Sequence, residues 1–75
     1  MAAAVLHLIK SGDTSLARAV IEQNLGAGDR VTVALLPGAA APDLPASVTV
    51  WRVSAGLSYE DLLDLIFAAD QVITW

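Results

Sequence analysis

The sequence predicts one α/β domain over residues 1–75, a small three-layer β-α-β-β-α-β fold with a mainly parallel four-stranded sheet. The chain has 75 residues, a length typical of a single small domain. Four short runs are rich in β-branched or aromatic residues, which favour strands. Two longer segments with helical spacing lie between the first and second runs and between the third and fourth. Such crossover segments are typical of parallel strand pairs.

The four predicted strands differ in how completely we expect them to be buried. The first two are almost continuously apolar, a pattern typical of strands that are covered on both faces of a parallel sheet. The third alternates, because Thr49 and Arg52 interrupt its apolar residues, and it is therefore expected nearer to solvent. The predicted strands are Val5–Ile9, Val31–Leu36, Val48–Val53 and Gln71–Trp75.

The first predicted helix spans Asp13–Leu25. Asp13 and Thr14 are residues whose side chains can accept a hydrogen bond from a backbone amide at a helix start. Gly26 follows the helix and is available for the left-handed position at its end. The predicted apolar stripe consists of Leu16, Val20 and Ile21.

The second predicted helix spans Ser58–Ala69. The Ser58 hydroxyl can bond the amide of Asp61, three residues further on, as a helix cap. Three acidic residues lie towards the amino-terminal half, where the helix dipole favours negative charge. These acids are Glu60, Asp61 and Asp64, and the predicted apolar face consists of Leu62, Leu65, Ile66 and Ala69.

A loop rich in alanine and proline, residues 37–47, connects the second and third strands. Its three prolines are incompatible with a regular helix. Because parallel crossovers are right-handed, we expect the sheet to close in the order 2-1-3-4, with an antiparallel third strand as the open alternative. Ligands of such sheets bind beyond the carboxyl ends of the strands. The loops expected to meet there, near the first and third strands, are Lys10–Thr14, Pro37–Ala40 and Ser54–Leu57.

The first of these loops is a candidate anion or ligand site. Ser11, Gly12, Asp13 and Thr14 combine a glycine, hydroxyl groups and a helix amino terminus, which together can hold an anion. The same residue types are ordinary at helix starts, and the carboxylate of Asp13 would repel an anion. The loop also lacks the glycine spacing of known phosphate loops. Capping is therefore the favoured interpretation.

His7 is the only histidine, and it lies inside the first predicted strand. A single imidazole in a buried strand is more often a hydrogen-bonded core residue than a general base, which also needs an orienting partner and a nucleophile within reach. Ser11 and Asp13 are the only nearby candidates for those roles in the sequence. We do not expect a catalytic triad from them.

Composition predicts contact with other chains. The sequence is 56% hydrophobic and 16% charged, whereas about 25% charged residues are usual. A small domain has too little interior to hide so much apolar surface, so we expect an oligomer or a complex. Aromatic residues are the preferred anchors of interfaces. The candidate interface residues are Trp51, Phe67 and Trp75, of which Trp75 is expected to end the last strand and to be held by packing.

Charge and residue types exclude several function classes. The net charge of −4 and the scattered basic residues argue against nucleic acid and anionic membrane as direct partners. The chain has no cysteine, and its acidic residues show no metal-ligand spacing, so we expect neither thiol chemistry, a metal nor a cofactor. The apolar start lacks a preceding basic region and is too short to span a membrane. A cytoplasmic protein that is not an enzyme is the expectation.

Three segments carry a resemblance to a known family. The segment "VLHLIKSGDTSLARAV" resembles the start of the TusB/DsrH branch of the DsrE-like sulfur-relay family, with Leu6, His7 and Ser11 as matching residues. "GDRVTVALL" is similar to that branch's second strand, and "SYEDLLDLIFAADQVITW" to its last helix and strand, which commonly end in tryptophan like Trp75. The chain departs from the family pattern at Pro37–Gly38 and in the short segment "SAGL".

The resemblance implies a DsrE- or flavodoxin-like fold and a non-catalytic subunit of a cytoplasmic sulfur-relay complex. Such complexes serve 2-thiouridine formation in tRNA or sulfur oxidation. Some relatives carry a cysteine near the position of Ala19, and its absence fits a role in which sister subunits hold the sulfur. Two alternatives stay open: a stand-alone homo-oligomeric domain without a sulfur role, and a small anion-binding protein that uses the Ser11–Thr14 loop.

Overall fold

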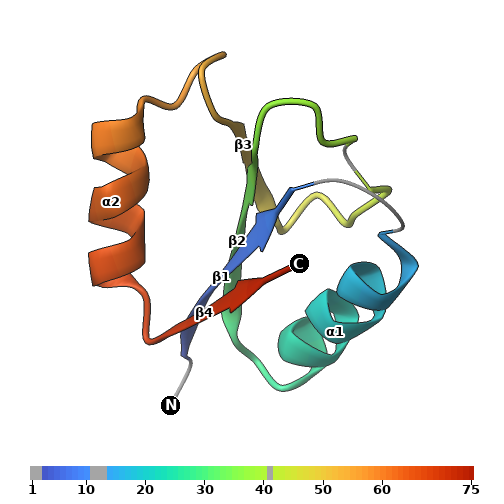
Figure 1. The fold of residues 1–75 in the computed structure, drawn as a ribbon. Coiled ribbons are helices and arrows are strands. Elements are labelled where there is room, and N and C mark those ends of the chain that lie inside the picture. The colour runs from blue at the N-terminus through green and yellow to red at the C-terminus, as the bar shows by residue number, and fades with distance from the viewer. Residues whose placement is uncertain (1–2, 11–13, 41) are drawn as a thin grey trace.

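The computed structural model describes residues 3–10, 14–40 and 42–75, and it confirms the α/β fold class (Figure 1). A four-stranded sheet lies between two helices, one on each face, which makes the expected three layers. All three strand pairs are parallel. In chain order the elements are β1 (Ala4–Ile9), α1 (Ser15–Gly26), β2 (Arg30–Leu35), β3 (Thr49–Arg52), α2 (Tyr59–Ala68) and β4 (Gln71–Thr74).

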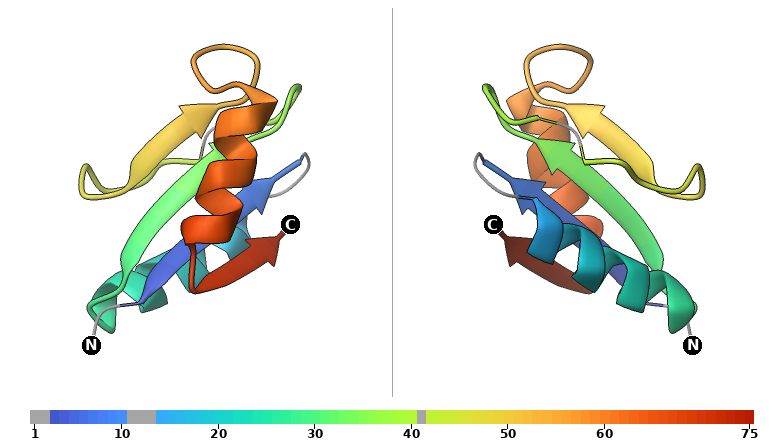
Figure 2. Two further views of the ribbon diagram at one scale, coloured as in Figure 1. Left: turned by 90° about the vertical axis from the view of Figure 1, so that its left-hand side faces the viewer. Right: turned by 90° about the vertical axis from the view of Figure 1, so that its right-hand side faces the viewer.

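The strand order is 3-2-1-4, so the predicted order 2-1-3-4 is wrong. The difference arises at the connection between β2 and β3, whose residues Ala39, Leu44 and Val48 pack into the same core cluster as α1. Because parallel crossovers are right-handed, two connections that run over one face move the chain in one direction across the sheet. The path therefore runs from β1 to β2 to β3. α2 then crosses the opposite face and returns the chain to the free side of β1, as both views in Figure 2 show.

The two central strands are buried, as their continuous apolar patterns predict. In β1, Ile9 contributes to the core on the α1 side, whereas Leu6 and Leu8 pack on the α2 side. In β2, the side chains of Val33 and Ala34 are completely buried, again on opposite sides. By contrast, all four residues of β3 are exposed, in agreement with an edge strand near solvent.

The apolar stripe of α1 differs from the prediction. Ala17 and Ile21 are its buried residues, and Leu25 packs against them from the next turn. This spacing of four residues follows one face of a helix. Leu16 lies on another face and is 66% exposed, so its predicted place in the core is wrong. Thr14 is the residue before the helix, but its side chain makes no capping hydrogen bond.

The end of α1 is also shifted from the prediction. Gly26 is still part of the helix, and the left-handed conformation expected there is adopted by Gly28, with φ of +84°. The Gly28 amide donates to the Leu25 carbonyl oxygen at 3.0 Å, and the Asp29 amide donates to the Asn24 carbonyl oxygen at 3.0 Å. The chain thus turns back towards β2 at the one residue type that adopts this φ without strain.

The start of α2 is capped as predicted. The Ser58 hydroxyl accepts a hydrogen bond from the Asp61 amide at 3.1 Å, and Glu60 and Asp61 lie in the first turn. Leu62 is buried on the sheet. The other members of the predicted apolar face, Leu65, Ile66 and Ala69, pack around the same core cluster.

We expect Ser58→Ala to lower the free energy of unfolding by about 1 kcal/mol, because the Asp61 amide loses its acceptor. Urea denaturation at neutral pH measures the change. Ser47→Ala, at an exposed serine of the loop before β3, is the matched control and should shift stability by less than about 0.5 kcal/mol. Equal effects of the two substitutions would contradict a capping role.

Candidate functional site

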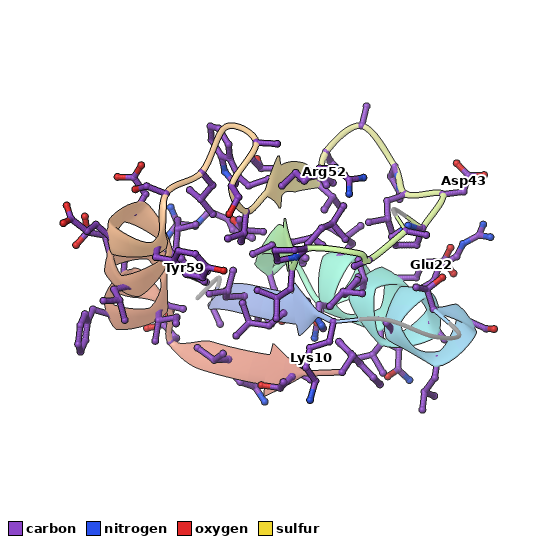
Figure 3. All side chains as sticks on the ribbon, turned by 45° about the horizontal axis from the view of Figure 1, so that its top comes forward. Lys10, Glu22, Asp43, Arg52 and Tyr59 are labelled. Atoms are coloured by element: carbon purple, nitrogen blue, oxygen red, sulfur yellow. The ribbon has the colours of Figure 1, made fainter. Side chains whose placement is uncertain are left out.

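The predicted anion loop is only partly described. Ser11, Gly12 and Asp13 lie outside the described residues, and Thr14 borders a cavity of about 350 Å³ beside α1. Glu22 and Asp43 also line this cavity and lie on the same side of the molecule in Figure 3. The basic side chain at the cavity is Arg18, whose Nε donates to the Glu22 carboxylate at 3.3 Å. Two carboxylates against one paired cation make the cavity unfavourable for an anion.

Of the three loops expected to meet near β1 and β3, the first lies largely outside the described residues, and β2 separates β1 from β3. Lys10 follows β1, whereas Arg52 ends β3 on the other side of β2, and Figure 3 shows the two side chains well separated. Arg52 Nη1 donates to the Ala39 carbonyl oxygen at 3.0 Å, which ties the end of β3 to the loop after β2. The basic residues at this edge of the sheet therefore form no common site.

His7 joins three separate parts of the fold. Its side chain, on β1, is completely buried. Nε2 lies 2.8 Å from Oδ1 of Asn24 on α1, and Nδ1 lies 3.0 Å from the indole Nε1 of Trp75, just after β4. The rings of His7 and Trp75 are nearly parallel, with an angle of 11° between their planes and 6.1 Å between their centroids. Both imidazole nitrogens thus have protein partners.

These contacts define the protonation state of His7. An indole N–H can only donate, so Nδ1 of His7 must accept, and the single proton of the neutral ring lies on Nε2, where it is donated to Asn24. Burial lowers the pKa of His7 below its ordinary value of 6.5, and the hydrogen bond to Asn24 opposes this shift in part. A second proton on Nδ1 would face the Trp75 N–H, donor against donor. His7 is therefore neutral at pH 7.

The structure confirms His7 as a hydrogen-bonded core residue. Neither nitrogen is free to exchange a proton with a substrate, because Asn24 and Trp75 occupy both. Its physical effect is to hold the end of the chain against β1 and α1. Sequence reasoning missed Asn24. The available signal was a polar residue of low helix propensity, three positions after Ile21 on the buried side of the helix.

Trp75 is held in place, as predicted, and is partly buried. Its backbone amide donates to the Leu8 carbonyl oxygen at 2.8 Å, which extends the pairing of β4 with β1 by one residue. Its side chain packs against the core cluster on the α1 side. Trp75 is therefore part of the packing of the domain itself. Its predicted role at an interface stays a prediction.

The two other candidate interface residues are exposed. Trp51 on β3 is 40% exposed and Phe67 on α2 is 83% exposed. Sequence reasoning missed five further exposed apolar side chains, which are Tyr59, Leu63, Val72, Val50 and Leu16. The first two precede Phe67 at intervals of four residues, a spacing that places all three along one side of α2. The sequence contained this signal, because α2 has apolar residues in addition to Leu62, Leu65 and Ile66, which form its buried face.

A larger cavity and the acidic side chains of the described residues indicate no further ligand or metal site. A second cavity, of about 580 Å³, lies at the amino ends of β1, β2 and β3, the edge opposite to that where parallel sheets bind ligands. Among residues 3–10, 14–40 and 42–75, there is no group of three or more histidine or acidic side chains that could hold a metal ion. Within the same ranges, neither helix has the length and apolar character needed to cross a bilayer. What remains prominent is the exposed apolar surface.

Comparison of this chain with models of known protein families, with curated protein sequences and with solved structures gave no match.

Proposed function

We propose that this protein is a non-catalytic subunit of a cytoplasmic sulfur-relay complex and acts by binding sister subunits. The observation that carries the assembly role is the set of large apolar side chains left exposed on an already small domain, from Val72 at 38% to Phe67 at 83%. Such side chains are typical of surfaces that contact other proteins. Among the described residues, His7 is hydrogen-bonded at both ring nitrogens, and no group of three or more histidine or acidic side chains could hold a metal ion.

The sulfur-relay part of the proposal rests on the chain's residues. The resemblance of the first strand, with Leu6 and His7, and of the last strand, with Trp75, to the TusB/DsrH branch supports it. The chain contains no cysteine, so a persulfide would have to be held by a partner that supplies the thiol. We assign the exposed edge strand β3, with the side chain of Trp51, as the surface that contacts this partner.

Affinity purification of the tagged chain from its native host tests this function. We expect it to recover cysteine-bearing sister subunits of the same fold, identified by mass spectrometry, with cyanide-labile sulfur bound to them. Trp51→Glu should reduce their recovery at least tenfold, because it places a charge in the apolar contact. Leu16→Glu, at an exposed leucine on α1, is the matched control and should leave recovery unchanged. Recovery of the chain alone would contradict the relay and favour a stand-alone homo-oligomer.

The purified chain by itself should carry no cyanide-labile sulfur and show no sulfurtransferase activity, because it has no thiol to form a persulfide. Incubation with a sulfane-sulfur donor such as thiosulfate, followed by cyanolysis and intact-mass measurement, checks this expectation. A stable mass increase of one sulfur atom on the chain would overturn the non-catalytic part of the proposal.

A further inference from the structure

Four exposed apolar side chains form one patch on the α2 side of the sheet. Tyr59, Leu63 and Phe67 follow one another along α2 with exposures of 61%, 53% and 83%, and Val72 of β4 is 38% exposed. Val72 is paired with Leu6, which belongs to the core on the α2 side, so Val72 faces that side too. We call these four residues the α2–β4 patch.

The position of α2 directs its apolar stripe towards β4. The opposite flank of the helix, with Leu65 and Ala68, lines the cavity that also touches Thr32 of β2 and Thr49 of β3. The flank with Tyr59, Leu63 and Phe67 therefore faces the β4 edge. Figure 2 (left) shows this arrangement, with α2 in front of the sheet and β4 at the open edge to its right.

β4 is short, with four residues, but its edge has no charged side chain, proline or bulge that would prevent pairing with another chain. Edge strands are commonly protected by charged side chains, proline or a bulge. β4 consists of Gln71, Val72, Ile73 and Thr74, which are uncharged and include no proline. Its register with β1 is continuous from Val5↔Gln71 to Leu8↔Thr74, without a bulge. The outer side of β4 is thus a regular, uncharged edge beside an apolar helix flank.

The area of the patch approaches what a stable dimer buries. Because an aromatic side chain presents about 150–250 Å² in all, the exposed parts of Tyr59 and Phe67 amount to roughly 300 Å², and the two aliphatic side chains add on the order of 150 Å². Two copies would bury about twice this area before the β4 backbone is counted, close to the ~1,000 Å² that a specific interface needs. The acidic residues of α2, Glu60 and Asp64, border the patch and are not part of it.

We propose that a second copy of this chain covers the α2–β4 patch, in a two-fold dimer whose β4 strands lie side by side in antiparallel directions. A two-fold axis places the same patch on both copies, so the apolar flank of each α2 meets its equivalent. This proposal deepens the assembly role proposed above but does not depend on the sulfur relay. The dimer face lies at β4, whereas the surface assigned to sister subunits lies at β3, on the opposite edge of the sheet.

Sedimentation equilibrium of the purified full-length chain, from 5 to about 200 micromolar, tests the dimer. We expect the wild-type protein to be predominantly dimeric and Phe67→Glu to raise the dimer dissociation constant at least a hundredfold. Phe67 is so exposed that the substitution should leave the fold intact, which circular dichroism verifies. Val72→Lys, which places a charge on the β4 edge, should weaken the dimer by tenfold or more.

Leu16→Glu is the matched control, because Leu16 is an exposed apolar residue on α1 and the substitution changes the net charge by the same amount. It should leave the dissociation constant within about twofold. A monomeric wild-type protein, or an equal effect of Phe67→Glu and Leu16→Glu, would overturn the proposal. A dimer that Phe67→Glu leaves intact but Trp51→Glu dissociates would place the interface at β3 and refute the assignment to β4. None of these outcomes depends on the sulfur-relay experiment.

Discussion

Trp75→Ala is expected to lower the free energy of unfolding by about 3 kcal/mol or more, the effect usual for removing a large aromatic side chain from a core. Two losses combine. The indole no longer packs on the core cluster at the α1 side, and the buried Nδ1 of His7 loses its hydrogen-bond donor. Because β4 has only four residues and pairs with β1 alone, the strand depends strongly on this contact. Urea denaturation followed by circular dichroism measures the change.

Two further substitutions separate the causes. Trp75→Phe keeps an aromatic ring but removes the N–H donor, so it should retain part of the packing and lower stability by about 1–3 kcal/mol. Trp51→Ala removes the same side chain from the exposed edge strand β3 and should have a smaller effect than Trp75→Ala. If Trp75→Ala left both thermal stability and oligomeric state unchanged, the contacts of Trp75 would have no energetic role.

Stability should fall as the pH is lowered below 6.5, because His7 has a lowered pKa in the folded protein. In the unfolded chain the imidazole takes up a proton near pH 6.5, whereas in the folded chain it does so only at lower pH. Between these two pKa values the unfolded state binds more protons, so the free energy of unfolding decreases with falling pH. The contribution is complete above pH 6.5, and its loss can reach about 1.4 kcal/mol per pH unit for one group.

Urea denaturation between pH 7.5 and 5.5 tests this dependence in a range where exposed carboxylates change little. Since His7 is the only histidine, its imidazole resonances give its folded-state pKa directly in an NMR titration. Asn24→Ala removes the acceptor for the Nε2 proton, the contact that raises the pKa, and should therefore lower the pKa further. A folded-state pKa at or above 6.5, or stability independent of pH over this range, would contradict the neutral, doubly bonded His7.

Local patterns were sufficient to predict most elements. Continuous apolar runs identified β1 and β2 as covered on both faces, and the alternation around Thr49 and Arg52 identified an exposed strand. The Ser58 cap followed from spacing along the chain alone. These features depend on neighbours within a few residues, which a single sequence displays directly. The regular spacing of Tyr59, Leu63 and Phe67 could also have been read from the local sequence. The exposed helix face that these residues form was nevertheless overlooked.

The sequence by itself thus determined the element order, the mainly parallel class of the sheet, the amino-terminal cap of α2 and the lack of any thiol. Only the tertiary structure decided the strand order, because that depends on which face the loop from β2 to β3 covers, and apolar residues such as Leu44 fit either face. It also decided the partners of His7. Asn24 and Trp75 lie 17 and 68 residues away along the chain, and only the packing of α1 and β4 on β1 brings their polar atoms to the two imidazole nitrogens.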